Sequence, residues 1–89
     1  MSTWQLEYDP AVVRWLNKAD RITARRIRDA LTAVVATGDP RIRGHALTGP
    51  LAGLWRYRVG DYRIICDIHD ERLVVLVIDI GNRDHIYDS

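Results

Sequence analysis

The chain has 89 residues and a formal net charge of +1, and 47% of its residues are hydrophobic. This length suits one small domain rather than two, and the apolar content excludes an intrinsically disordered chain. The only cysteine, Cys66, excludes an internal disulfide and fits a reducing compartment. We therefore expect one domain over residues 1–89.

Neither a secretion signal nor a membrane anchor is predicted. The N-terminal stretch MSTWQLEYDP lacks a basic segment followed by an apolar run, which a signal peptide requires. The longest apolar run, LVVLVI, is far shorter than a membrane span. We expect a soluble protein of the cytoplasm with no membrane partner.

The N-terminal half predicts a strand followed by two helices. Residues 3–8 alternate apolar and polar side chains, as in a half-buried strand. Pro10 lies in the first turn of a short helix, and Asp20 is a candidate cap for a longer helix that reaches about Thr37. Apolar residues of the longer helix follow the helical repeat. They are Ile27, Ala30, Leu31, Val34 and Val35.

The C-terminal half predicts a loop and three strands. Residues 41–53 contain three glycines and a proline and are expected to form a loop. Strands over residues 54–59 and 62–69 flank Gly60-Asp61, a good two-residue hairpin turn. Asp70-Glu71 is a second such turn, and an apolar strand follows over residues 72–80.

The predicted order is therefore β-α-α-β-β-β. Strands that follow one another through short turns pair antiparallel, and amphipathic helices bury their apolar stripes against a sheet. We predict an α+β fold in which two N-terminal helices pack on one face of a small antiparallel sheet.

The first hairpin brings arginines together. A two-residue turn at Gly60-Asp61 places Arg58 directly opposite Arg63, and strand alternation places Arg56 on the same face as Arg58. Like charges that face each other across a ladder cost roughly 0.2–1 kcal/mol per pair. The sequence therefore predicts that repulsion between arginines destabilises this hairpin, which calls for a structural or functional explanation.

The second turn extends this cluster. A two-residue loop at Asp70-Glu71 pairs His69 with Arg72 and Arg63 with Ile78. The last strand then ends near the Gly60 turn, so that Arg83, and Tyr87 four residues later, can join the other arginines.

Two interpretations of this cluster stay open. The arginines form either a solvated sheet face, neutralised by Asp61, Asp79 or Asp84, or a site for a multiply charged anion such as a phosphodiester. Twelve of the thirteen basic residues are arginine; genomic base composition and phosphate binding both produce such a bias. The three histidines, at positions 45, 69 and 85, fit no metal-ligand spacing, and no metal or cofactor is expected.

The segments LWRYRVGDYRIICDI and VVLVIDIGNRDHIY resemble the RelE/ParE superfamily of bacterial toxins, and more closely its RelE branch. The resemblance covers the whole chain. The first strand, the helical pair, the loop ALTGPLAG and the closing Arg-x-x-x-Tyr all follow the family order.

The resemblance implies a toxin of a type II toxin–antitoxin system. RelE-type members cut messenger RNA in the ribosomal A site without a metal, through attack of the RNA 2′-hydroxyl on the adjacent phosphate. A cognate antitoxin binds and silences them in a hetero-oligomer. The expected partners are therefore an antitoxin, the ribosome and mRNA.

The resemblance assigns catalytic roles to residues that match the family pattern. These are Arg56 and Arg58 on the second strand, Arg63 on the third strand, and Arg83 and Tyr87 after the last strand. Some members carry lysines on the second strand, one of them a candidate general base. Arginine, with a pKa above about 12, is a poor base.

Two other functions remain as alternatives. A ParE-like toxin poisons DNA gyrase by binding and performs no RNA chemistry, and Arg63 is shared between the two branches. An inactive binding scaffold would keep the fold alone. The combination of Arg56, Arg58 and Arg83 with Tyr87 favours the endoribonuclease.

Overall fold

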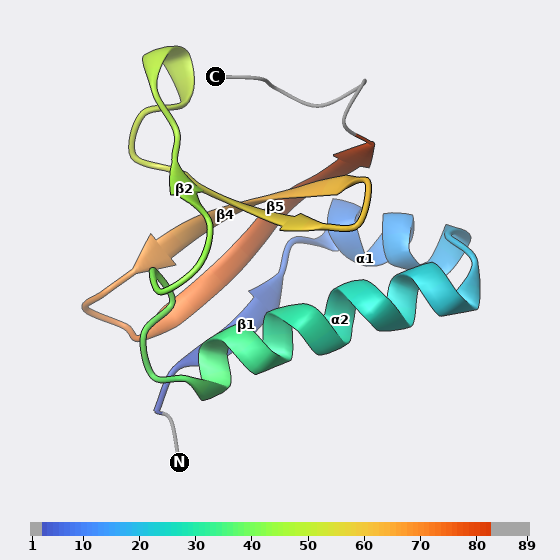
Figure 1. Ribbon diagram of the computed structural model, residues 1–89, viewed down its shortest axis with the longest axis horizontal. Helices are drawn as coiled ribbons and strands as arrows, with labels where there is room; N and C mark the ends of the chain where they lie inside the picture. Colours follow the sequence, from blue (N-terminus) through green and yellow to red (C-terminus); the bar gives the residue numbers. More distant parts are fainter. Residues whose placement is uncertain (1–2, 83–89) are drawn as a thin grey trace.

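The computed structural model describes residues 3–82, and it contains two α-helices and a five-stranded sheet (Figure 1). The elements in chain order are β1 (Gln5–Tyr8), α1 (Pro10–Lys18), α2 (Arg21–Ala36), β2 (His45–Ala46), the 3₁₀ turn η1 (Gly49–Leu51), β3 (Trp55–Val59), β4 (Tyr62–His69) and β5 (Val74–Asn82).

Both helices begin where the sequence predicts. The Asp9 carboxylate accepts a hydrogen bond from the Ala11 amide, at 2.9 Å, with Pro10 in the first turn of α1. The Asp20 carboxylate caps α2 by accepting from the amide and the hydroxyl of Thr23, at 2.9 and 2.6 Å. These bonds satisfy amides that have no partner within the helix and lower the pKa of Asp20.

The helices cover one face of the sheet, as predicted (Figure 1). Their apolar stripes meet residues that alternate along β3, β4 and β5. The core consists of Val12, Leu16, Ala24, Ile27, Leu31, Val34, Val35, Tyr57, Ile64, Cys66, Val75, Val77 and Ile80. The buried thiol of Cys66 has a raised pKa because burial disfavours the thiolate, which agrees with a core position.

The sheet is mixed rather than wholly antiparallel, which corrects one prediction. Its strand order is β1-β5-β4-β3-β2. β1 runs parallel to β5, with Tyr8 opposite Val77, whereas the other three pairings are antiparallel. The reason is topological: short turns force their strands antiparallel, but the helices that separate β1 from β5 along the chain impose no such constraint.

The segment predicted as one loop also contains regular structure. β2 and η1 both lie within residues 41–53. Leu47, directly after β2, is 4% exposed, so this segment packs onto the domain instead of extending into solvent. No helix within residues 3–82 has the length and apolar character to cross a membrane.

Candidate functional site

The hairpin formed by β3 and β4 has the predicted register. Arg58 lies directly opposite Arg63, and Val59 lies opposite Tyr62. Gly60, in the two-residue turn, has a φ of +58°, a left-handed conformation that glycine adopts without strain. The turn therefore fixes the two arginines as a cross-strand pair.

The three arginines of the hairpin share the face of the sheet that lies away from the helices. Tyr57, between Arg56 and Arg58, is 3% exposed and packs in the helix-side core. Ile64, which follows Arg63, is also in that core. Because side chains alternate along a strand, the arginines project from the opposite face. We call Arg56, Arg58 and Arg63 the arginine face.

The pairing of β4 with β5 differs from the prediction. His69 pairs with Val74 rather than Arg72, and Arg63 pairs with Gly81 rather than Ile78. The turn comprises the four residues 70–73, not two, and a register shift between Ile65 and Cys66 adds one further residue on β5.

The predicted convergence nevertheless holds as far as the described chain reaches. Asn82, the last residue of β5, lies opposite Tyr62 beside the Gly60 turn. Arg83 and Tyr87, the two other predicted site residues, lie outside the described residues. The structure therefore brings together three of the five predicted site residues.

Acidic side chains lie at different distances from the arginine face. Asp79 lies opposite Ile65, two residue pairs along β4 from Arg63 and on the same face. Asp61 is an exposed turn residue, and Asp84 lies outside the described residues. The contact between His69 Nε2 and Asp67 Oδ2, at 3.1 Å, lies at the far end of β4.

A fourth side chain joins the arginine face, and sequence reasoning missed it. His45 in β2 lies directly opposite Arg56 in β3, so the two side chains share a face. A two-residue strand carries too short an alternation to be recognised in a sequence. The one available signal was the apolar pair Ala46-Leu47 directly after His45 in a glycine-rich stretch.

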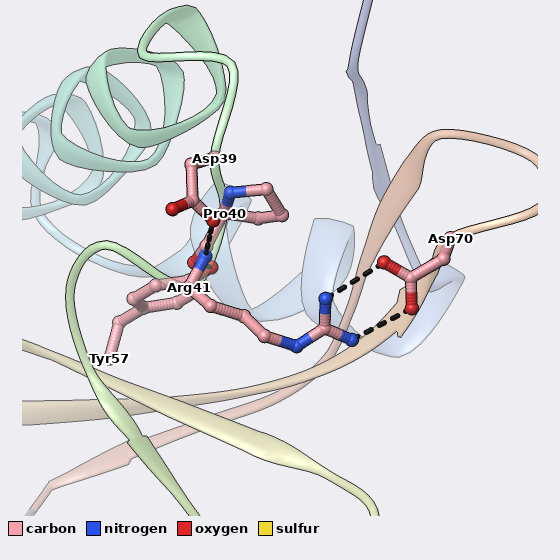
Figure 2. Close-up of polar contacts among 5 residues, drawn as sticks. All are labelled: Asp39, Pro40, Arg41, Tyr57 and Asp70. Carbon is pink, nitrogen blue, oxygen red and sulfur yellow. Dashed lines mark hydrogen bonds and ion pairs between the residues drawn. The ribbon is translucent and has the colours of Figure 1, made fainter.

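The segment that carries β2 is held by side chains of β3. Trp55 Nε1 donates a hydrogen bond to the Arg43 carbonyl at 2.7 Å. The Tyr57 hydroxyl donates to the Pro40 carbonyl (Figure 2), and burial of the phenol raises the pKa of Tyr57. These bonds connect the chain after α2 to the strand that carries Arg56.

An ion pair holds the same segment at its other end. Arg41 donates from two guanidinium nitrogens to the two carboxylate oxygens of Asp70, at 2.8 and 2.9 Å (Figure 2). The hydrogen bonds from Arg41 lower the pKa of Asp70. The pair connects the segment after α2 to the β4–β5 turn.

A groove of about 300 Å³ runs beside the arginine face, between α2 and β3. Ala30, Ala33 and Val34 line its helical side. β2 pairs only with Trp55 and Arg56, so the outer edge of β3 beyond Arg56 borders the groove. Arg43 and Arg58 also contribute to its lining, so the groove combines an apolar helical wall with basic side chains.

No group of three or more metal-ligating side chains gathers anywhere in residues 3–82. Around the hairpin, the groups that this face offers to an anion are the three guanidinium groups and the imidazole of His45. Fixed guanidinium groups bind phosphate and stabilise negative charge that develops on it.

The comparisons with known proteins agree with this fold. A family model described as the ParE toxin of type II toxin–antitoxin systems, parDE, matches residues 6–87. The chain belongs to this toxin family. The resemblance to the RelE/ParE superfamily is thereby confirmed. No curated protein sequence matches the chain.

Solved structures of RelE proteins have the same fold. The chain is similar to the toxin–antitoxin complex RelBE2 from Mycobacterium tuberculosis, at 27% identity and a TM-score of 0.75, over 90% of this chain and 98% of that one. It is also similar to isolated RelE from E. coli, at 24% identity and a TM-score of 0.73, over 90% and 84% of the two chains.

A third similar structure is an archaeal RelE–RelB complex from Pyrococcus horikoshii. It shares 24% identity with this chain at a TM-score of 0.71, over 94% and 99% of the two chains. The protein is therefore a type II toxin–antitoxin toxin of the RelE/ParE superfamily with an α+β, RelE-like fold.

Proposed function

We propose that this toxin is a ribosome-dependent endoribonuclease that cuts mRNA in the A site and stops translation in the cytoplasm. The observation that carries the proposal is the arginine face. Arg58 and Arg63 lie directly opposite each other, and Arg56 lies two residues along β3 from Arg58 on the same side. Guanidinium groups held at this spacing bind a phosphate through charge-assisted hydrogen bonds.

The proposed reaction is transesterification within the RNA. The 2′-hydroxyl of one nucleotide attacks the adjacent phosphorus, which passes through a pentacoordinate state with added negative charge. Guanidinium groups held in advance by the sheet stabilise that charge. Because the nucleophile belongs to the substrate and the positive charge to the protein, this reaction needs no metal ion.

Two residues beyond β5 complete the proposed site. By the resemblance, Arg83 supplies another guanidinium group, and Tyr87 stacks on a splayed base or orients the 2′-hydroxyl. Asn82 ends β5 beside Tyr62, and Arg83 is the next residue along the chain. This adjacency supports the assignment of Arg83.

Expression in cells tests the target. Without an antitoxin, expression of the toxin should reduce incorporation of labelled amino acids before it reduces DNA synthesis. In vitro, the purified toxin should cut mRNA on programmed ribosomes and leave the same mRNA intact in free solution. Cleavage positions mapped to the A-site codon would establish the reaction, and an uncut message would refute it.

The match to the ParE family model favours a second candidate function, poisoning of DNA gyrase. Purified gyrase with supercoiled plasmid separates the two functions. A gyrase poison would trap cleaved plasmid and induce the DNA-damage response while translation continues. An endoribonuclease would leave gyrase unaffected. A protein inactive in both assays would be a binding scaffold.

We also propose that a cognate antitoxin silences this toxin in a hetero-oligomer. Two of the similar structures are toxin–antitoxin complexes. The groove between α2 and β3 suits an extended or helical segment with apolar and acidic residues, because its helical wall is apolar and its lining includes Arg43 and Arg58. Such a segment would also cover the arginine face.

A complex with the antitoxin tests this arrangement. Arg58→Glu should weaken antitoxin binding, whereas Arg28→Glu on the exposed side of α2 should leave it unchanged. A complex that is inactive while the arginine face stays open and undistorted would contradict the steric part of the proposal.

A further inference from the structure

Arg56, Arg58 and Arg63 cannot themselves accept a proton. In the proposed cleavage, on which this inference rests, the 2′-hydroxyl must lose its proton as it attacks phosphorus. Guanidinium groups stay charged at neutral pH and donate hydrogen bonds without accepting them. A separate group must therefore take the proton.

The pairing of β2 with β3 brings such a group to the site. His45 is directly opposite Arg56, and Arg58 is its diagonal neighbour on the same strand. Side chains in these positions have Cβ atoms about 5 Å and 7–8 Å apart. An imidazole at position 45 therefore reaches a phosphodiester that the arginines hold.

The backbone around His45 is fixed by a close contact. Gly44 has a φ of +85°, and a Cβ atom there would lie 2.4 Å from the Arg56 carbonyl oxygen and 2.6 Å from Trp55 Nε1. Only glycine permits this approach. Together with the hydrogen bond from Trp55 to the Arg43 carbonyl, this contact fixes the backbone of His45 beside β3. A side chain that transfers a proton needs such a fixed position.

The charged residues of β3, the strand that pairs with β2, are both arginines. Arg56 and Arg58 face His45 from β3, and Arg43 lies two residues before it. Where α2 lines the neighbouring groove it contributes only apolar side chains. An anionic substrate, and not a carboxylate of these elements, is thus the expected neighbour of the imidazole.

Other proton acceptors on this face suit the role less well. His69 contacts Asp67 and lies six residues along β4 from Arg63, about 20 Å at the usual rise. Asp79 is nearer, but a carboxylate repels the phosphate of the substrate. An imidazole ordinarily titrates near neutrality, where a general base works best.

We propose that His45 is the general base of RNA cleavage. Its neutral imidazole takes the proton of the 2′-hydroxyl while the O2′–P bond forms and the P–O5′ bond breaks. The products are a 2′,3′-cyclic phosphate and a 5′-hydroxyl, whose proton comes from water. His45 then returns its proton to solvent.

Single-turnover cleavage on programmed ribosomes, measured against pH, tests this role. His45→Gln should lower the rate roughly 10²–10⁴-fold, the usual contribution of a positioned base, and should remove the rise of the rate with pH. The affinity for ribosomes should stay within about twofold. The smaller variant His45→Gly should regain cleavage when free imidazole is added.

His69→Gln is the matched control. It removes an imidazole from the same face of the sheet, at a position about 20 Å from Arg63 along β4. It should leave both the rate and the pH profile unchanged. Circular dichroism of each variant checks the fold.

The outcomes separate this inference from the proposed function. If the wild type and His45→Gln cleave with the same rate and pH profile, while Arg58→Gln does not cleave, His45 is not the base and the endoribonuclease proposal survives. If His45→Gly loses cleavage but imidazole restores nothing, the residue is structural and the inference is wrong. If the wild type does not cleave, both proposals fail.

Discussion

Replacing Arg58 by Gln separates the two interpretations of the arginine face. Arg58 is exposed and directly opposite Arg63. At the roughly 5 Å of a cross-strand pair, two unit charges repel by about 1 kcal/mol in a water-like dielectric. Salt and side-chain freedom reduce this figure, so about 1 kcal/mol is the most that the substitution can recover.

Arg58→Gln should therefore unfold at an equal or slightly higher temperature than the wild type. A gain of 1 kcal/mol in a domain of this size corresponds to a rise of roughly 4–8 °C. The same substitution should lower single-turnover cleavage roughly 10²–10³-fold, the usual cost of one donor to a transition state. Arg63→Gln and Arg83→Gln should show a similar loss of cleavage.

Arg28→Gln is the control for a general loss of positive charge. Arg28 lies on the exposed side of α2, on the helical layer rather than on the arginine face, and its removal should change cleavage little. The reasoning is refuted if Arg58→Gln loses stability and still cleaves at the wild-type rate. The arginines would then serve the fold through acidic neighbours.

Two further substitutions test the segment that carries β2. Gly44→Ala should destabilise the protein by at least about 2 kcal/mol in denaturant titration, because it adds a clash with the Arg56 carbonyl to a left-handed conformation that costs a non-glycine residue about 1–2 kcal/mol. Arg41→Gln should lower the unfolding temperature slightly at pH 7. Arg41 lowers the pKa of Asp70 in the folded state. The ion pair therefore stabilises the fold above the ordinary carboxyl pKa, and this stabilisation is lost as pH falls through the lowered pKa of Asp70. The unfolding temperatures of the variant and the wild type should therefore converge in acid.

The sequence was sufficient where local rules act alone. The helix start at Pro10 and the cap at Asp20 depend on a few consecutive residues, and so does the tight turn at Gly60. The Arg58–Arg63 pair follows from that turn. These predictions were confirmed because no distant contact competes with the local preference.

The sequence was insufficient where contacts between distant segments decide which of several locally favourable conformations forms. Asp70-Glu71 resembles a two-residue turn, but the turn has four residues, and Leu73 adopts a φ of +54° that its residue type disfavours. The Leu73 carbonyl accepts from the Gln5 amide at 2.8 Å. That contact with β1 could not be anticipated, because nothing local indicated a parallel partner for β5.

The register shift in β5 shows how packing and the arginine face are connected. Val75 and Val77 face the helices, and strict alternation would put Asp79 into the same core. Burial of an unpaired carboxylate costs several kcal/mol. The pairings Ile65–Asp79 and Cys66–Val77 leave Ile78 as an extra residue on β5, so that Ile80, at 5% exposed, enters the core instead.

The same bulge decides which end of β5 meets the arginines. Beyond it, Asp79 and Gly81 take the side of the sheet that carries Arg63, with Gly81 directly opposite that residue. Bulges bend a strand and re-aim the residues that follow. The core thus selects the register, and the register brings the chain before Arg83 to the hairpin turn. The register that keeps Asp79 out of the core therefore also sets Gly81 opposite Arg63 and ends β5 beside the hairpin turn.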